Sequence, residues 1–183
     1  MFYMSRLLLI TIALAFLLMD TVSAQEEPFI KQMEALGLYF YSTLESAYKY
    51  FGRGSNEIFS YEMRMKNKTE GLEIFLIYNR TVSGDKLLVP HIEFTRQIAD
   101  MATNDEDARI WTKNFSVDDL KKYHADWGAE AEFYLKKGIS RFRKGRVVCI
   151  FREGRQMASV LYCYNKKSQL PDLISFIDDA SQQ

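Results

Sequence analysis

The sequence lacks the residues from which most catalytic and metal sites are built. It holds only two histidines, two cysteines and three prolines in 183 residues. Two histidines exclude an all-histidine zinc site, and no G-x-S-x-G elbow or H-E-x-x-H helix is present. We therefore expect no cofactor and no metal, and an enzyme is the less favoured of the two function classes.

Net charge is also absent. The 24 basic side chains balance the 24 acidic ones, whereas a dedicated nucleic-acid binder needs a clear positive excess. We expect no nucleic-acid partner. Aromatic residues make up 14% of the chain, which is typical of a chain that folds rather than of a disordered one.

Residues 1–24 predict a secretory signal peptide. Arg6 is the only charge before the apolar run Leu7–Met19, which Asp20 ends. A run of 13 residues is too short to span a bilayer, because a spanning helix needs about 20. Small residues precede a cleavage site that we predict after Ala24. The expected location is secreted or periplasmic, with no membrane span after cleavage.

The expected fold is a single α+β domain over residues 25–183. Apolar residues recur every three or four positions from Pro28 to Phe51, which predicts a long first helix. Pro171 to Ala180 predicts a closing helix. Pro90 to Thr103 predicts another helix, and Ser116 is the predicted N-cap of a short one, with Asp119 completing a capping box.

Strands are predicted from apolar residues that alternate or run on between turns. Their ranges are Phe59–Lys66, Leu72–Tyr78, Ala129–Lys137, Arg146–Arg152 and Met157–Asn165. Short turns between neighbours favour antiparallel pairing. We expect a mainly antiparallel sheet of about five strands, with the N-terminal and C-terminal helices packed on one face.

The segment from Tyr123 to Gly128 is the first candidate site. His124 could act as an acid or base near neutral pH, with Asp126 orienting it. The alternative is a helix-ending turn, with Asp126 bonded to nearby amides, Trp127 packed and Gly128 supplying backbone freedom. Side chains two positions apart diverge on most backbones, which favours the turn.

A basic cluster is the second candidate. It comprises Lys136, Lys137, Arg141, Arg143, Lys144 and Arg146. A basic hairpin tip can bind phosphate-rich or sulfated polymers or anionic lipid headgroups, although a solvated loop that protects a sheet edge is the alternative. The ligand-binding candidates are Trp127, Arg141, Arg143, Lys144 and Arg146, and aromatic contacts are considered for Tyr61, Tyr78, Tyr134 and Tyr162.

The two cysteines form a possible disulfide. A tight Glu153-Gly154 turn places Cys149 opposite Ala158, and a longer loop places it opposite Cys163. Turn chemistry favours the tight turn and free cysteines. Three N-x-S/T sequons, at Asn67, Asn79 and Asn114, matter only in a eukaryotic secretory route.

A family resemblance covers Phe115 to Tyr164. Ala125-Asp126-Trp127-Gly128-Ala129, Cys149 after a strand, the Glu153-Gly154 hairpin and Ala158 resemble a small uncharacterised family of exported bacterial proteins. That family carries no assigned activity, so the resemblance implies no catalytic residue. It implies a periplasmic or surface location.

Two hypotheses follow. The first is an exported protein of the cell envelope that acts as a non-catalytic binding or accessory module, its partner being an anionic polymer, a lipid headgroup or an envelope protein. The alternative is a small periplasmic or secreted hydrolase or lyase that uses His124 and Asp126.

Overall fold

The chain divides into two compact units, residues 1–36 and 37–183. The computed structural model describes residues 30–31, 33–41, 48–67, 69, 71–79, 89–166 and 170–178. In the first unit, residues 30–31 and 33–35 are helical. The predicted signal peptide lies outside the described residues, so it stays a prediction, as does the domain boundary after residue 24.

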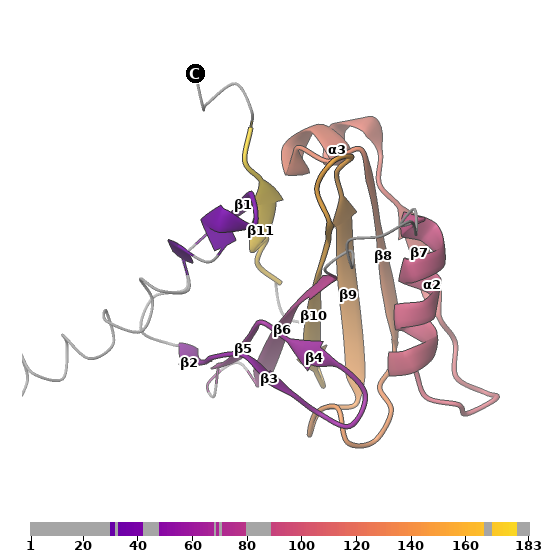
Figure 1. Ribbon diagram of the computed structural model, residues 1–183. Coiled ribbons are helices and arrows are strands. Elements are labelled where there is room, and N and C mark those ends of the chain that lie inside the picture. Colours follow the sequence, from indigo (N-terminus) through magenta and orange to yellow (C-terminus); the bar gives the residue numbers. More distant parts are fainter. Residues whose placement is uncertain are drawn as a thin grey trace, which may run out of the picture. The chain divides into compact units, whose positions relative to one another are not determined.

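A seven-stranded antiparallel sheet forms the centre of the second unit, in the order β2-β5-β6-β10-β9-β8-β7 (Figure 1). Its strands are β2 (Tyr48–Phe51), β5 (Met63–Asn67), β6 (Leu72–Asn79), β7 (Trp111–Asn114), β8 (Trp127–Tyr134), β9 (Lys144–Phe151) and β10 (Met157–Tyr164). All eight residues of the central strand β10 are buried, which requires cover on both faces of the sheet.

The helix α2 (Pro90–Met101) covers one face, here called the α2 face (Figure 1). Its buried side chains Phe94, Ile98 and Met101 share a core with alternate residues of β8, β9 and β10. The helix predicted from Pro90 to Thr103 is therefore confirmed to within two residues at its end. The period of 3.6 that predicts it also selects the face it buries.

The opposite face, here called the α3 face, is covered in part by α3 (Val117–Tyr123). Ser116 caps this helix in a reciprocal capping box with Asp119, as predicted. The ring of Phe115 stacks on Tyr123 at 5.2 Å and fills the space that a side chain at Gly128 would need. No helix in the described part of the chain is long and apolar enough to cross a membrane.

Two short ribbons complete the described strands. β1 (Leu38–Phe40) pairs with β11 (Ile174–Phe176), and β3 (Gly54–Ser55) pairs with β4 (Ser60–Tyr61). The segment before β11 lies on the α3 face, because the Tyr162 hydroxyl donates to the Pro171 carbonyl at 2.6 Å.

The helix predicted from Pro28 to Phe51 is borne out at residues 30–31 and 33–35 and is wrong over the described residues after them, and the helix predicted from Pro171 to Ala180 is wrong over residues 171–178. The first helical segment ends at Gly37, whose φ of 71° suits a helix C-terminus, and β1 and β2 follow. The strand β11 lies within the range that was predicted as the closing helix. Backbone pairing between β1 and β11 overrides the helical spacing of their apolar residues, since local propensity is a weak preference.

The predicted fold class is wrong in consequence. The sheet has seven strands rather than five, and α2 and α3 lie on opposite faces rather than terminal helices on one. The edge strand β7 was not predicted. All four of its residues are exposed, so it carries no apolar alternation that would predict a strand.

Candidate functional site

The two candidate clusters lie at opposite ends of β8. His124, at the end before the strand, is the C-cap of α3 in the left-handed conformation, with φ 49° and ψ 44°. Its Nδ1 is 3.9 Å from Asp178 Oδ2, which is longer than a hydrogen bond.

Asp126 is bonded away from His124. Its Oδ2 accepts the Glu153 backbone N–H at 2.7 Å, and its own N–H donates to the Phe151 carbonyl at 2.9 Å. These bonds join the start of β8 to the turn between β9 and β10. The predicted acid–base pair is therefore not formed, and the arrangement matches the helix-ending turn.

The residues after Asp126 also serve the fold. Trp127 packs edge-on against Phe94 at 5.7 Å, on the α2 face. Gly128 does not have a positive φ; its lack of a side chain makes room for the Phe115 ring. The expectation of backbone freedom at Gly128 is thus corrected to a requirement for space, and Trp127 lies away from the basic residues grouped with it.

The basic loop between β8 and β9, residues 136–143, is anchored to the core. Ile139 and Phe142 are 3% and 9% exposed. The Ser140 hydroxyl donates to Glu73, a carboxylate that is 1% exposed and that also pairs with Arg64. Packing of these residues fixes the backbone from which the charged side chains of the loop extend.

This loop forms one wall of a cavity of about 680 Å³. Its cations are Lys136, Lys137, Arg141 and Arg143. The other wall is the segment after α2, residues 103–108, which contributes Asp105 and Asp107. Basic side chains outnumber acidic ones in the lining, so the cavity favours an anion.

Most of these cations are not neutralised by a described residue. Lys136 Nζ donates to the Ala99 carbonyl at 2.7 Å, at the end of α2. Within the part of the chain that the structure describes, Lys137, Arg141 and Arg143 form no ion pair. Arg141 lies over the Phe142 ring at 4.9 Å, a cation–π contact that favours one orientation of its guanidinium without neutralising its positive charge.

A second cavity of about 200 Å³ adjoins the first, because Tyr134 lines both. Lys144, Arg109 and Trp111 are among its lining residues. The side chains of Trp111 and Tyr134 are 52% and 43% exposed. Tyr134 was a predicted contact residue, whereas Tyr162 is buried and Tyr61 packs on the core of the α2 face.

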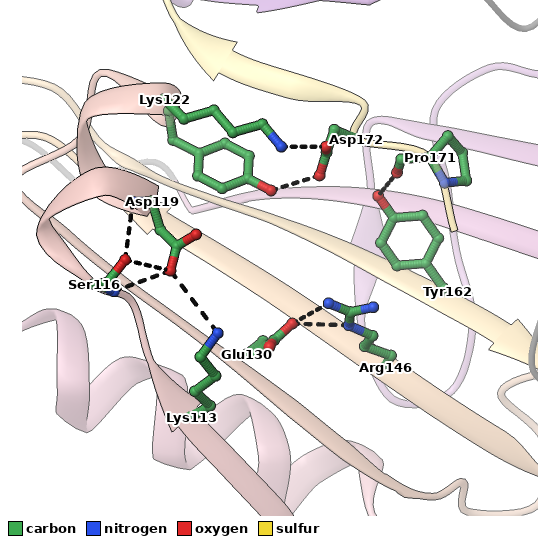
Figure 2. A network of polar contacts seen from close by, with 10 residues as sticks. Lys113, Ser116, Asp119, Lys122, Glu130, Arg146, Tyr162, Pro171 and Asp172 are labelled. Carbon is green, nitrogen blue, oxygen red and sulfur yellow. Dashed lines mark hydrogen bonds and ion pairs between the residues drawn. The ribbon is translucent and has the colours of Figure 1, made fainter. Parts of the chain in front are cut away.

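Arg146 belongs to a structural network instead (Figure 2). Its Nε donates to Glu130 Oε2 at 2.9 Å, and both lie on the α3 face. Burial alone would lower the pKa of Arg146, but the hydrogen bond to Glu130 and the nearby carboxylates raise that pKa above its ordinary value. Arg146 lines neither described cavity, so we remove it from the predicted ligand-binding set.

The same network attaches the C-terminal segment to α3. Lys122 and the Tyr123 hydroxyl both donate to Asp172, the latter at 2.6 Å (Figure 2). Partial burial would raise the pKa of Asp172, but these two hydrogen bonds hold that pKa below its ordinary value. Burial is the largest cause that raises the pKa of Tyr123, and the hydrogen bond to Asp172 raises that pKa further.

The two cysteines are free and buried. Cys149 lies opposite Ser159 and Cys163 lies opposite Gly145, so the register of β9 and β10 does not bring the thiols together. Burial raises the pKa of Cys149 to about 12, which leaves the thiol protonated and unreactive at neutral pH. No group of three or more described His, Cys, Asp or Glu residues could hold a metal ion.

The sequons differ in access. Asn67 is 2% exposed, and its Oδ1 accepts the Thr69 N–H at 3.0 Å. Asn114 is exposed on β7. Asn79 ends β6, and its side chain lies outside the described residues.

Sequence reasoning missed four residues that line the cavities: Asp105, Asp107, Arg109 and Trp111. A signal for Trp111 exists in hindsight, because Arg109 and Lys113, the residues two positions to either side of it, are both charged. Only the pairing of β7 with β8 brings it beside Tyr134.

Comparison of the chain with protein-family models, curated proteins and solved structures finds no match. The resemblance to an exported bacterial family therefore stays a prediction.

Proposed function

We propose that this chain is an exported, non-catalytic binding module of the cell envelope that holds an anionic ligand in its larger cavity. Export and the envelope location rest on the pattern of residues 1–24. The binding activity rests on one observation: Lys137, Arg141 and Arg143 line a cavity of about 680 Å³ without forming ion pairs with described residues.

The chemistry of these side chains suits an oxyanion. An arginine guanidinium presents parallel N–H groups that match carboxylate, sulfate or phosphate, and lysine adds a point charge. A concave site strengthens such contacts because it excludes part of the screening water.

The opposite wall supports selectivity. Asp105 Oδ1 accepts the Asp107 N–H at 3.2 Å, so the Asp105 carboxylate is fixed within its own turn. An anion placed near that wall is repelled, which limits where charge is tolerated and thereby discriminates between ligands.

A binding role is favoured over a reaction because the described lining of the cavity holds no activated nucleophile. Its one serine, Ser140, donates a hydrogen bond to Glu73, and neither histidine nor cysteine is among the described lining residues. His124 lies at the opposite end of β8.

The test is calorimetric titration with tripolyphosphate at low salt. We expect the Arg141→Ala/Arg143→Ala variant to lose about tenfold or more in affinity, since charge-assisted hydrogen bonds contribute about 1.5–3 kcal/mol each. The matched control is Lys121→Ala/Arg53→Ala, which removes equal charge from exposed sites elsewhere.

Wild-type protein that does not bind, or variants that lose affinity equally, would overturn the proposed function. An affinity that depends on net charge alone would produce the second outcome.

A further inference from the structure

The smaller cavity carries two exposed aromatic rings in register. Trp111 on β7 lies opposite Glu132, and Tyr134, two residues further along β8, lies opposite Lys144. Side chains alternate along a strand, and residues that lie opposite each other share a face. The α3 face therefore carries the side chains of Trp111, Tyr134 and Lys144. Trp111 and Tyr134 are diagonal neighbours, a relation that places residues roughly 7–8 Å apart.

Basic side chains surround these rings. Lys144 lies beside Tyr134 in the ladder, and Arg109 comes two residues before Trp111. Neither cation forms an ion pair with a described residue. On the far side of Lys144 is Tyr164, which is 2% exposed and closes the inner wall of the cavity.

We propose that this corner is a subsite for a sugar ring, so that the ligand of the proposed binding module is an acidic polysaccharide. The inference rests on the proposed function, because the charged groups of the chain occupy the larger cavity while a ring lies on Trp111 and Tyr134. Tyr134 lines both cavities and connects the two parts of the site.

The combination of side chains selects this ligand over simpler ones. The face of an aromatic ring is electronegative and attracts the C–H groups of a pyranose. Lys144 and Arg109 can donate to hydroxyls and carboxylates, and Glu132 can accept from hydroxyls. A cationic ligand would be repelled by Lys144 and Arg109, and a purely apolar ligand would leave them without partners.

A small inorganic anion would not use the rings at all. Nucleobases stack on aromatic side chains as well, but single-strand binders also require a positively charged track along the backbone. The zero net charge of this chain and the two acidic residues of the larger cavity favour a sparsely charged glycan over a nucleic acid.

The experiment compares three polyanions by titration at one salt concentration: an oligomer of galacturonic acid, a polyglutamate peptide with equal carboxylate number, and oligothymidylate. We expect the wild type to prefer the galacturonate oligomer over polyglutamate by about tenfold, the size of one good ring contact. Trp111→Ala, which alters the smaller cavity alone, should abolish that preference while leaving polyglutamate affinity unchanged, and Tyr134→Ala should abolish the preference as well.

Two further measurements guard against indirect effects. Ile92→Ala removes an equally exposed apolar side chain from α2 and should keep the preference. The chain has two tryptophans, so a Trp127→Phe variant isolates Trp111, whose fluorescence should shift with galacturonate and not with polyglutamate.

The outcomes separate the two proposals. Binding of no polyanion overturns the proposed function. Equal affinity for galacturonate and polyglutamate, or a preference that survives Trp111→Ala and Tyr134→Ala, overturns the sugar subsite and leaves the anion site standing. A preference for oligothymidylate overturns the subsite in favour of nucleic-acid stacking.

Discussion

The two ends of β8 both carry polar residues and use them differently. Before the strand, Asp126 accepts a backbone N–H and His124 ends a helix. After the strand, the backbone of residues 136–143 is held by Ile139, Phe142 and Ser140, and Arg141 and Arg143 are left without ion pairs among described residues.

The difference shows what separates a structural turn from a binding loop. A polar side chain that satisfies a neighbouring amide lowers the energy of one backbone conformation and has little left for a ligand. A loop whose conformation is fixed by buried residues can keep its charged groups for another molecule.

The largest expected effect comes from breaking the anchor of the basic end. Glu73→Gln removes the buried charge that Arg64, Lys66 and Ser140 share. We expect the free energy of unfolding to fall by about 2–3 kcal/mol, since one partner of a buried charged cluster is lost. Anion affinity should fall too, because the loop is less well held. Urea unfolding and tripolyphosphate titration measure the two effects.

The matched control is Glu57→Gln, which removes the same charge from an exposed position beside Gly138 of the loop. It should leave stability nearly unchanged and raise anion affinity slightly. If Glu73→Gln also raises affinity, the loop acts through net charge alone and the contrast between the two ends of β8 collapses.

Much of the sheet could be predicted from local pattern. The strands β8, β9 and β10 carry alternating or continuous apolar residues and α2 carries helically spaced ones, and such patterns depend on the element alone. The strand β1 could not be predicted. Its residues 38–40 lie within a segment whose apolar residues recur at helical spacing, and yet they pair with residues 174–176, which are distant in sequence. No local signal encodes a partner so far along the chain.

The candidate site was predicted in part. Clustering in sequence was enough to find Arg141, Arg143 and Lys144, because the basic loop and the first residue of β9 carry them. Arg146 has the same charge, but it lies two residues further along β9, where it pairs with Glu130. Trp111 joins the site only through the pairing of an exposed strand, which composition cannot reveal.

A smaller effect is expected at the structural end. Asp126→Ala leaves the Glu153 N–H without its acceptor, and we expect a loss of about 1–2 kcal/mol in the free energy of unfolding. Asp126→Asn should recover most of it, because the amide oxygen can accept the same bond. Tripolyphosphate affinity should stay at the wild-type value in both variants. A loss of affinity with unchanged stability would show that this end also binds ligand.

The smallest effect concerns the cap of α3 and its dependence on pH. The hydrogen bond from the Ser116 side chain is the largest cause that holds the pKa of Asp119 below its ordinary value, and the bond from the Ser116 backbone N–H lowers that pKa further. A carboxyl whose pKa is lowered by folding stabilises the folded state above its unfolded pKa, and that contribution is lost as pH falls through the folded value. Ser116→Ala should therefore cost about 1 kcal/mol at neutral pH, and the gap from wild type should narrow as the pH falls below about 4. Thermal unfolding from pH 3 to 7 measures the gap, and a gap that stays constant would show that the bond between Ser116 and the Asp119 carboxylate adds nothing to the cap.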